Sequence, residues 1–241
     1  MEKHPSWLVM AILLFAASGE AQTVFPPSHR AWEFSVFGGG SFIGDRQFPT
    51  PVMGSSQETL RTVGLHYGTG PQLGVRMSEI RWDHWGADFD YSYSNQPLTF
   101  TNLSPDIPSL GLGHSIHRFI YDVAYYPFDR RSRLRPFAFA GAGVSLFYLD
   151  GSSKSSAASL GVHLEDQWKF TFSWGGGIKY LVMDHIAFSF RFADNVTGVP
   201  GYGLPRSANE VGGRFVPGFT PDGYQHNWLV AVAFDYQWGQ R

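Results

Sequence analysis

KFTFSWGGGIKYLVMDHIAFSFRF, residues 169–192, decides how the rest of the chain is interpreted. In both halves large apolar side chains alternate with small or polar ones, and the connection between the halves is short enough to require an antiparallel hairpin. Side chains two residues apart share one face of a strand. One face therefore carries Phe172 and Phe188, and the other carries Lys179 and Arg191. A bulky apolar outer face with a polar inner face is typical of a strand surrounded by lipid.

The composition limits the class of protein. The chain has 241 residues, 28 of them Gly, with aromatic residues at 17% and charged residues at only 16%, which suits short strands and many turns. A net charge of -2 gives no reason to expect a nucleic-acid partner. Because the sequence contains no Cys, it has no disulfide framework, no thiol nucleophile, no thiolate metal site and no cysteine for a lipid anchor.

The N-terminal segment is predicted to be a signal peptide. Lys3 precedes the apolar run 7–17, and the small residues that follow end in Ala21, after which we expect cleavage. We therefore assign residues 1–21 to the signal peptide and residues 22–241 to one domain, whose β-barrel architecture is derived from its strands below. No other stretch has about 18 uninterrupted apolar residues, so a helical membrane protein is excluded.

Alternation with a period of two recurs along the chain and predicts eight strands. In the clearest case, Trp85 and Phe89 lie on one face, with Asp88 and Asp90 on the other. The strands are predicted at 32–42, 72–80, 85–94, 115–126 and 136–149, in both arms of 169–192, and at 224–238.

Long and short connections alternate between these strands. The long ones are interpreted as loops and fall at 43–70, 95–113, 150–167 and 195–223, and within the first of them 62–67 is a candidate for an outward extension of the second strand. Bacterial outer-membrane barrels show the same asymmetry, with short periplasmic turns and long external loops. The chain is therefore predicted to be an all-β protein: an eight-stranded antiparallel up-and-down transmembrane β-barrel with both termini in the periplasm.

Aromatic residues gather near the short-turn ends of the predicted strands. Amphipathic rings at that level are typical of a membrane interface. The residues are Trp32, Trp82, Trp85, Tyr126, Phe128, Tyr180 and Trp238.

The chain resembles the OmpA/OmpX-type eight-stranded outer-membrane barrels over nearly all of its mature length. The resemblance rests on RPFAFAGAGVSLF at 135–147, on WGGGIKYLVMDHIAFSFRF at 174–192 and on FDYQW at 234–238. It implies a location in the outer membrane. Members of this family usually end on an aromatic residue that the assembly machinery reads, whereas here three residues follow Trp238.

Charged residues on the predicted inner face are the first candidates for function. An eight-stranded barrel has an interior just wide enough to be filled by side chains, and an unpaired buried charge costs several kcal/mol. We therefore expect an ion-pair network that plugs the barrel, with a gate or narrow ion path as the alternative. The predicted network comprises Glu33, Arg76, Asp88, Asp90, Arg118, Asp122, Lys179, Arg191 and Asp235.

A second candidate lies at the outer end of the strand 115–126. Some outer-membrane barrels are lipid A hydrolases or acyltransferases that use His and Ser near the outer leaflet, and Ser115 and His117 share the predicted lipid-facing side. No third, orienting carboxylate is evident nearby. These residues remain weak candidates for catalysis, with polar loop-edge residues as the alternative interpretation.

No metal and no cofactor is expected. The glycines at 38–40 and 175–177 lie within predicted strands, so the strand–loop–helix setting of a phosphate loop is missing. No pair among the remaining histidines has metal-ligand spacing with a supporting carboxylate. These histidines are His66, His84, His163, His185 and His226.

The sequence thus predicts a non-enzymatic, monomeric barrel with a structural or surface-interaction role. Its expected partners are outer-membrane lipid and lipopolysaccharide, with any extracellular ligand or receptor bound at the long loops. A lipid A-modifying enzyme, a narrow channel and a soluble lipocalin-like carrier with an apolar cavity are the alternatives.

Overall fold

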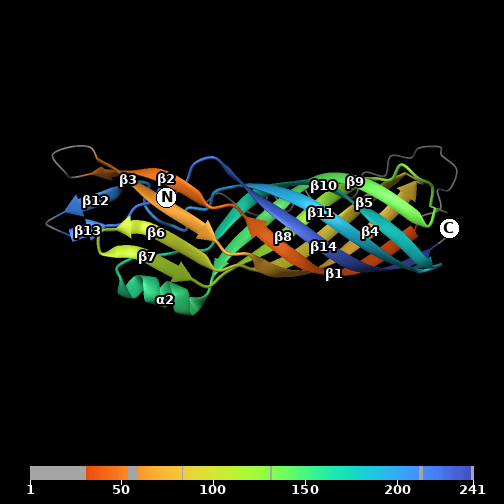
Figure 1. The fold of residues 1–241 in the computed structure, drawn as a ribbon, viewed down its shortest axis with the longest axis horizontal. Coiled ribbons are helices and arrows are strands. Elements are labelled where there is room, and N and C mark those ends of the chain that lie inside the picture. The colour runs from red at the N-terminus through yellow and green to blue at the C-terminus, as the bar shows by residue number, and fades with distance from the viewer. Residues whose placement is uncertain (1–30, 54–58, 83, 131, 212–213, 240–241) are drawn as a thin grey trace, which may run out of the picture.

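Eight strands close into an antiparallel barrel. The structure, a computed structural model, describes residues 31–53, 59–82, 84–130, 132–211 and 214–239, so the predicted signal peptide lies outside the described residues. Around the barrel the order is β1-β14-β11-β10-β9-β8-β5-β4, with β1 pairing with both β14 and β4 (Figure 1). The strands are β1 (Ala31–Ile43), β4 (Gly70–Trp82), β5 (Trp85–Asn95), β8 (His114–Tyr125), β9 (Leu134–Leu149), β10 (Gln167–Met183), β11 (Ile186–Gly198) and β14 (Tyr224–Gly239).

The alternation in sequence decides which side chains lie outside the barrel. Phe172 on β10 and Val232 on β14 are 45% and 57% exposed, whereas the inward Lys179 and Arg191 are 4% and 7% exposed. The predicted fold of an eight-stranded transmembrane β-barrel is confirmed. No helix in the described part of the chain is long and apolar enough to cross a membrane.

Strand β9 departs from the rule that bulky residues face outward. Its Phe137 and Phe139 are buried inside the barrel. On the neighbouring β10 they lie opposite Gly177 and Gly175, where an added Cβ would come within 2.5 Å and 2.8 Å of the two rings. The rings therefore occupy space that only glycine leaves free.

One member of the predicted aromatic rim is placed differently. Tyr126 is 2% exposed and lies inside the barrel, with the guanidinium of Arg135 4.3 Å from its ring centroid and the ammonium of Lys179 5.5 Å from it. Cations attract an aromatic face, which accounts for the inward position. The side chain of Trp82 lies outside the described part of the chain, and the other predicted rim residues are exposed: Trp32, Trp85, Phe128, Tyr180 and Trp238.

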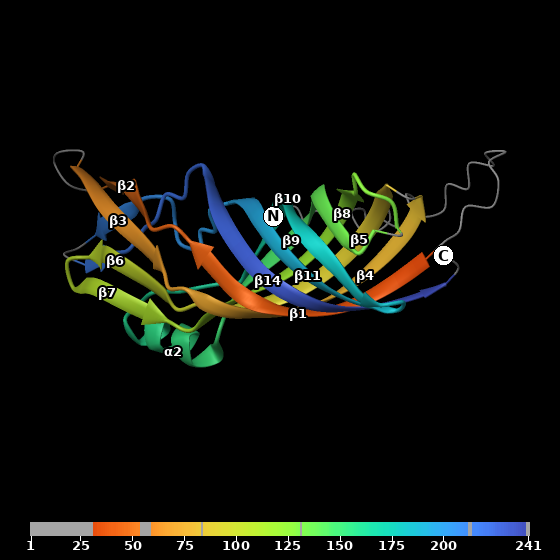
Figure 2. The same ribbon diagram turned by 45° about the vertical axis from the view of Figure 1, so that its right-hand side comes forward.

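The four long connections are not irregular loops. They form a second, six-stranded sheet in the order β13-β12-β2-β3-β6-β7, which continues beyond one end of the barrel together with one helix (Figures 1 and 2). We call the described residues of these connections the loop module. Its elements are β2 (Arg46–Met53), β3 (Thr59–Tyr67), β6 (Leu98–Ser104), β7 (Ile107–Leu112), α2 (Gly151–Ser159), β12 (Ala208–Val211) and β13 (Arg214–Val216).

The candidate extension of the second barrel strand at 62–67 is confirmed in part. These residues lie in β3, which ends just before β4 begins and pairs with β6 as β4 pairs with β5. Because β3 also pairs with β2, it is a separate strand of the module sheet. The chain leaves the module at Gly68, whose backbone N–H donates to the carbonyl oxygen of Pro97 at 2.8 Å. A Cβ at Gly68 would lie 2.5 Å from the Pro97 ring, so the close approach requires glycine.

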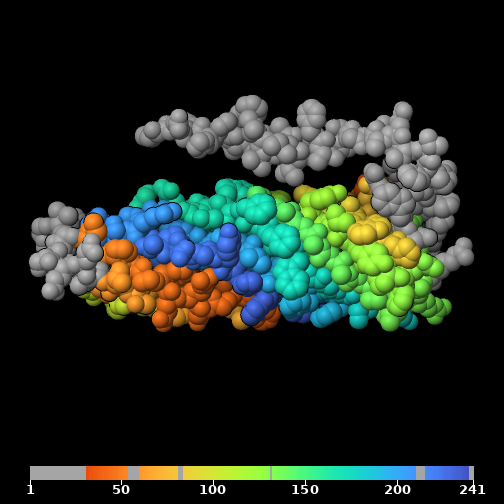
Figure 3. Space-filling view, turned by 90° about the horizontal axis from the view of Figure 1, so that it is seen from above, coloured from red at the N-terminus to blue at the C-terminus, as the bar shows by residue number. Residues whose placement is uncertain are grey.

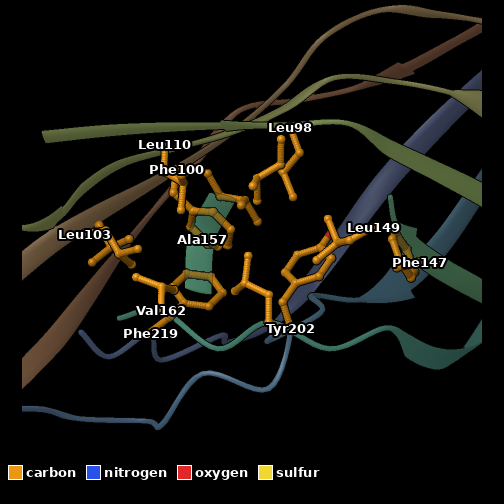
Figure 4. Close-up of a cluster of buried hydrophobic side chains, with 14 of the residues drawn as sticks. Leu98, Phe100, Leu103, Leu110, Phe147, Leu149, Ala157, Val162, Tyr202 and Phe219 are labelled. Carbon is orange, nitrogen blue, oxygen red and sulfur yellow. The ribbon is translucent and has the colours of Figure 1, made fainter. Parts of the chain in front are cut away.

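The loop module has its own apolar core. Phe100 is fully buried at its centre, with its ring 5.9 Å from Tyr202 and 5.5 Å from Phe219 in edge-to-face geometry. Leu98 from β6, Ala157 from α2 and Val162 join it (Figure 4). The cluster also takes in Phe147 and Leu149 from the outer end of β9, so the module packs onto the barrel. In the space-filling view, barrel and module form one continuous body (Figure 3).

Removal of one core ring should open the loop module without unfolding the barrel. Phe100→Ala is expected to cost about 3–5 kcal/mol, because the cavity it leaves is enclosed by the module core. In detergent micelles the variant should keep heat-modifiable gel mobility while trypsin cleaves the module at Arg61 or Arg206. Leu60→Ala is the matched control, because Leu60 is 73% exposed on the same sheet. Loss of heat-modifiable mobility in Phe100→Ala would show that barrel and module are not separable.

Candidate functional site

The nine charged side chains predicted for the interior all lie inside the barrel. Each lies at an inward position of its strand and is at most 9% exposed. They come from seven of the eight barrel strands, and β9 adds a buried cation that the prediction did not include, Arg135. The residues are Glu33 on β1, Arg76 on β4, Asp88 and Asp90 on β5, Arg118 and Asp122 on β8, Lys179 on β10, Arg191 on β11 and Asp235 on β14.

Arg191 is the centre of the larger group of paired charges. Its Nη1 lies 3.1 Å from Asp90 Oδ2 and 3.6 Å from Asp88 Oδ2, and its Nη2 donates to Asp122 Oδ2. On the other side of Asp90, Arg76 Nε donates to Asp90 Oδ1 at 2.6 Å. Asp90 is thus shared by two arginines, and β11 is tied across the interior to β5 and β8.

A smaller group lies toward the short-turn end. Lys179 Nζ donates to Glu33 Oε1 at 2.5 Å, and Gln237 Nε2 donates to Glu33 Oε2 at 2.6 Å. Both oxygens of the carboxylate are therefore satisfied. Together the two groups take up seven of the nine predicted charges.

The two remaining charges are unpaired. Neither terminal nitrogen of Arg118 and neither carboxylate oxygen of Asp235 has a hydrogen-bond partner among the described residues, although both side chains are buried. The interior holds a cavity of about 30 Å³, whose lining includes Arg76, Arg118 and Arg191. A space of that size holds little more than single water molecules, so the charges themselves fill most of this part of the interior.

The structure does not join the two weak catalytic candidates. His117 Nδ1 lies 3.0 Å from the hydroxyl of Tyr91, and the His117 ring also packs against Tyr93 at 5.1 Å. No hydrogen bond links His117 to Ser115 in the described part of the chain. His117 therefore belongs to an aromatic cluster on the outer side of β5 and β8.

A different histidine has a carboxylate partner. His226 Nδ1 lies 2.8 Å from Asp194 Oδ2, in a pair that sequence analysis missed. Asp194 falls at an outward position of β11, between Trp174 on β10 and Trp228 on β14 in the strand register. The alternation of the strand alone could have identified Asp194. It places this carboxylate on the lipid-facing side, where a charged group needs a partner.

A hydrogen-bond chain joins the loop module to the barrel, and it was also missed. Tyr67 and Tyr202 are 3.1 Å apart at their hydroxyls, and Tyr202 lies 3.2 Å from His114 Nε2. His114 Nδ1 faces the carbonyl oxygen of Gln96 at 3.2 Å. A carbonyl can only accept, so Nδ1 donates and Nε2 accepts from Tyr202. Burial raises the pKa of both tyrosines, which keeps the hydroxyls protonated.

In the part of the chain that the structure describes, no group of three or more His, Asp or Glu side chains could hold a metal ion.

No known protein family and no curated protein sequence matches this chain. Solved structures do match it. Outer membrane protein OprG from Pseudomonas aeruginosa superimposes with a TM-score of 0.54 at 16% identity, covering 89% of this chain and 99% of that chain. Outer membrane protein AlkL in DMPC lipid bilayers gives a TM-score of 0.51 at 13% identity, covering 99% of this chain and 97% of that chain. At such identities the likeness is one of fold.

Breaking the Lys179–Glu33 pair should strongly destabilise the barrel. In Lys179→Met, Glu33 stays buried without its cation, which is expected to cost about 3–5 kcal/mol in urea unfolding from detergent micelles. The double variant Lys179→Met/Glu33→Gln should recover much of this loss, because it buries no net charge.

Lys154→Met is the matched control for this prediction. Lys154 forms a 2.7 Å pair with Asp166, but both side chains are about one third exposed, so the expected cost is below about 1 kcal/mol. If Lys179→Met were no more harmful than Lys154→Met, the interior pair would not contribute to stability as described.

Proposed function

We propose that this chain, which has the fold of the OmpA/OmpX-type eight-stranded outer-membrane barrels, is a non-catalytic, closed outer-membrane barrel that displays an ordered binding surface outside the cell. The observation that carries the proposal is the apolar core of the loop module, which holds the four long connections in one defined shape. A preorganised surface loses less conformational entropy when it binds a partner than flexible loops would.

The outer surface of the barrel supports a location in lipid. Large apolar side chains lie exposed around the wall, among them Phe34, Phe172, Phe188, Phe234 and Val232. Soluble proteins rarely expose contiguous apolar areas of that extent, whereas hydrocarbon solvates them. The predicted signal peptide is consistent with export. A lipocalin-like carrier is disfavoured, because ion pairs cross the described interior and the cavity of about 30 Å³ there is too small for an apolar ligand.

The interior supports a barrel that does not conduct. Arg191 crosses it to three carboxylates, and Lys179 and Glu33 fill the short-turn half. A single chain also closes the barrel completely, so no barrel strand needs a second copy to cover an edge. Both features favour a monomer with a plugged lumen.

The loop module is the proposed contact surface for an extracellular ligand or receptor. Leu60, Met53 and Val216 leave apolar side chains exposed on its sheet, beside the exposed pair that Arg61 forms with the backbone oxygen of Asn102 at 2.7 Å. The aromatic wall below the module would contact membrane lipid and lipopolysaccharide.

Planar-bilayer recordings test the closed interior. The wild-type protein should give no discrete conductance steps, because Arg191 and its carboxylates block the lumen. Arg191→Ala should produce measurable current, since it removes the side chain that crosses the interior. Leu60→Ala on the module surface should remain silent. Regular conductance steps from the wild-type protein would favour a narrow channel instead.

Mass spectrometry of lipid A tests the absence of catalysis. Outer membranes containing the wild-type protein and those containing His117→Ala should give the same lipid A species, because His117 Nδ1 is hydrogen-bonded to the Tyr91 hydroxyl and not to Ser115. Loss or transfer of an acyl chain with the wild type, abolished by His117→Ala, would identify a lipid A-modifying enzyme.

A further inference from the structure

We propose that Arg118 forms an internal binding site for a small inorganic anion of the halide class. The site lies inside the barrel, on the module side of the Arg191 network. It would be built by the Arg118 guanidinium with the hydroxyls of Ser92 and Ser173, which line the same cavity. This inference does not depend on the proposed role at the cell surface.

The first argument is the state of the Arg118 side chain. It is 2% exposed, and both of its terminal nitrogens lack a hydrogen-bond partner among the described residues. A guanidinium stays protonated in proteins. A buried, uncompensated charge of this kind is strongly destabilising, so the molecule gains if a counter-ion binds there.

The second argument is that the carboxylates of the cavity are already engaged. Asp90 and Asp122 line it too, but Asp90 accepts from Arg76 and forms an ion pair with Arg191, and Asp122 Oδ2 accepts from Arg191. Asp122 is also four residues from Arg118 on the same strand, which separates their backbones by about 13 Å. Neither carboxylate forms an ion pair with Arg118.

The third argument is the chemistry and size of the cavity. Ser92 lies directly beside Arg118 in the β5–β8 register, and Ser173 reaches the cavity from β10. Hydroxyls can donate to an anion, and charge-assisted bonds of this type are the stronger ones. A volume of about 30 Å³ suits a particle near the size of water rather than a sulfate or an organic acid. A water molecule would also fit, but it would leave the arginine charge uncompensated.

Anion-dependent stability tests the site. The full chain in detergent micelles is unfolded thermally in sodium chloride and in sodium gluconate at equal ionic strength. With chloride a few-fold above its dissociation constant, the wild-type midpoint should be higher in chloride by about 2–4 °C. Arg118→Met should lose this difference, whereas Arg133→Met, which alters a basic residue of the 126–133 turn, should keep the wild-type shift.

Bromide binding gives a second readout that does not depend on unfolding. The wild-type protein should broaden the ⁸¹Br resonance, and chloride should reverse the broadening. Ser92→Val retains the arginine but fills part of the cavity, so it should broaden the ⁸¹Br resonance less than the wild type does. This variant still tests the site if Arg118→Met does not fold. An equal chloride shift in wild type and Arg118→Met, no shift in the wild type, or unchanged broadening in Ser92→Val would overturn the proposal.

Discussion

The pairing of charges inside a narrow barrel is the constraint on which the rest of the structure depends. Eight strands leave no room for bulk water in the interior, and hydrocarbon lies against the outer wall. Inward charges are therefore most stable with partners in the protein, and seven of the nine predicted charges pair between different strands rather than along one strand. Because Arg191 on β11 pairs with carboxylates on β5 and β8, opposite walls are held together and the interior is filled.

The loop module depends on the barrel in turn. Barrel strands β8 and β9 supply His114, Phe147 and Leu149 to the junction, where the tyrosine–histidine chain and the apolar core meet. From the barrel toward the loop module, the interior therefore contains three kinds of contact in turn. Ion pairs come first, then hydrogen-bonded polar groups such as Ser41, Asn227 and Gln96, and then the apolar core of the module. The mouth of the barrel and the loop module therefore share one packed junction.

Much of the barrel could be predicted from a period of two, but its pairings could not. Alternation is enough to place Lys179 inward and Phe188 outward, because the face on which a side chain lies depends only on its position along its own strand. It does not reveal which opposing strand Arg191 reaches, nor that Phe137 faces inward over Gly177. The module was missed because Pro49 and Pro51 interrupt the expected signature of β2, and because its partner β12 lies about 150 residues further along the chain.

A cysteine scan along β11 tests most directly which side of the wall meets lipid. The chain contains no Cys, so single substitutions from Phe188→Cys to Phe192→Cys can carry one spin label each in reconstituted bilayers. Accessibility to dissolved oxygen should alternate, high at 188, 190 and 192 and low at 189 and 191, since hydrocarbon concentrates oxygen and the lumen excludes it. Uniform accessibility, or labels at 188, 190 and 192 that are reached by a water-soluble nickel reagent instead, would contradict a barrel whose bulky face is solvated by lipid.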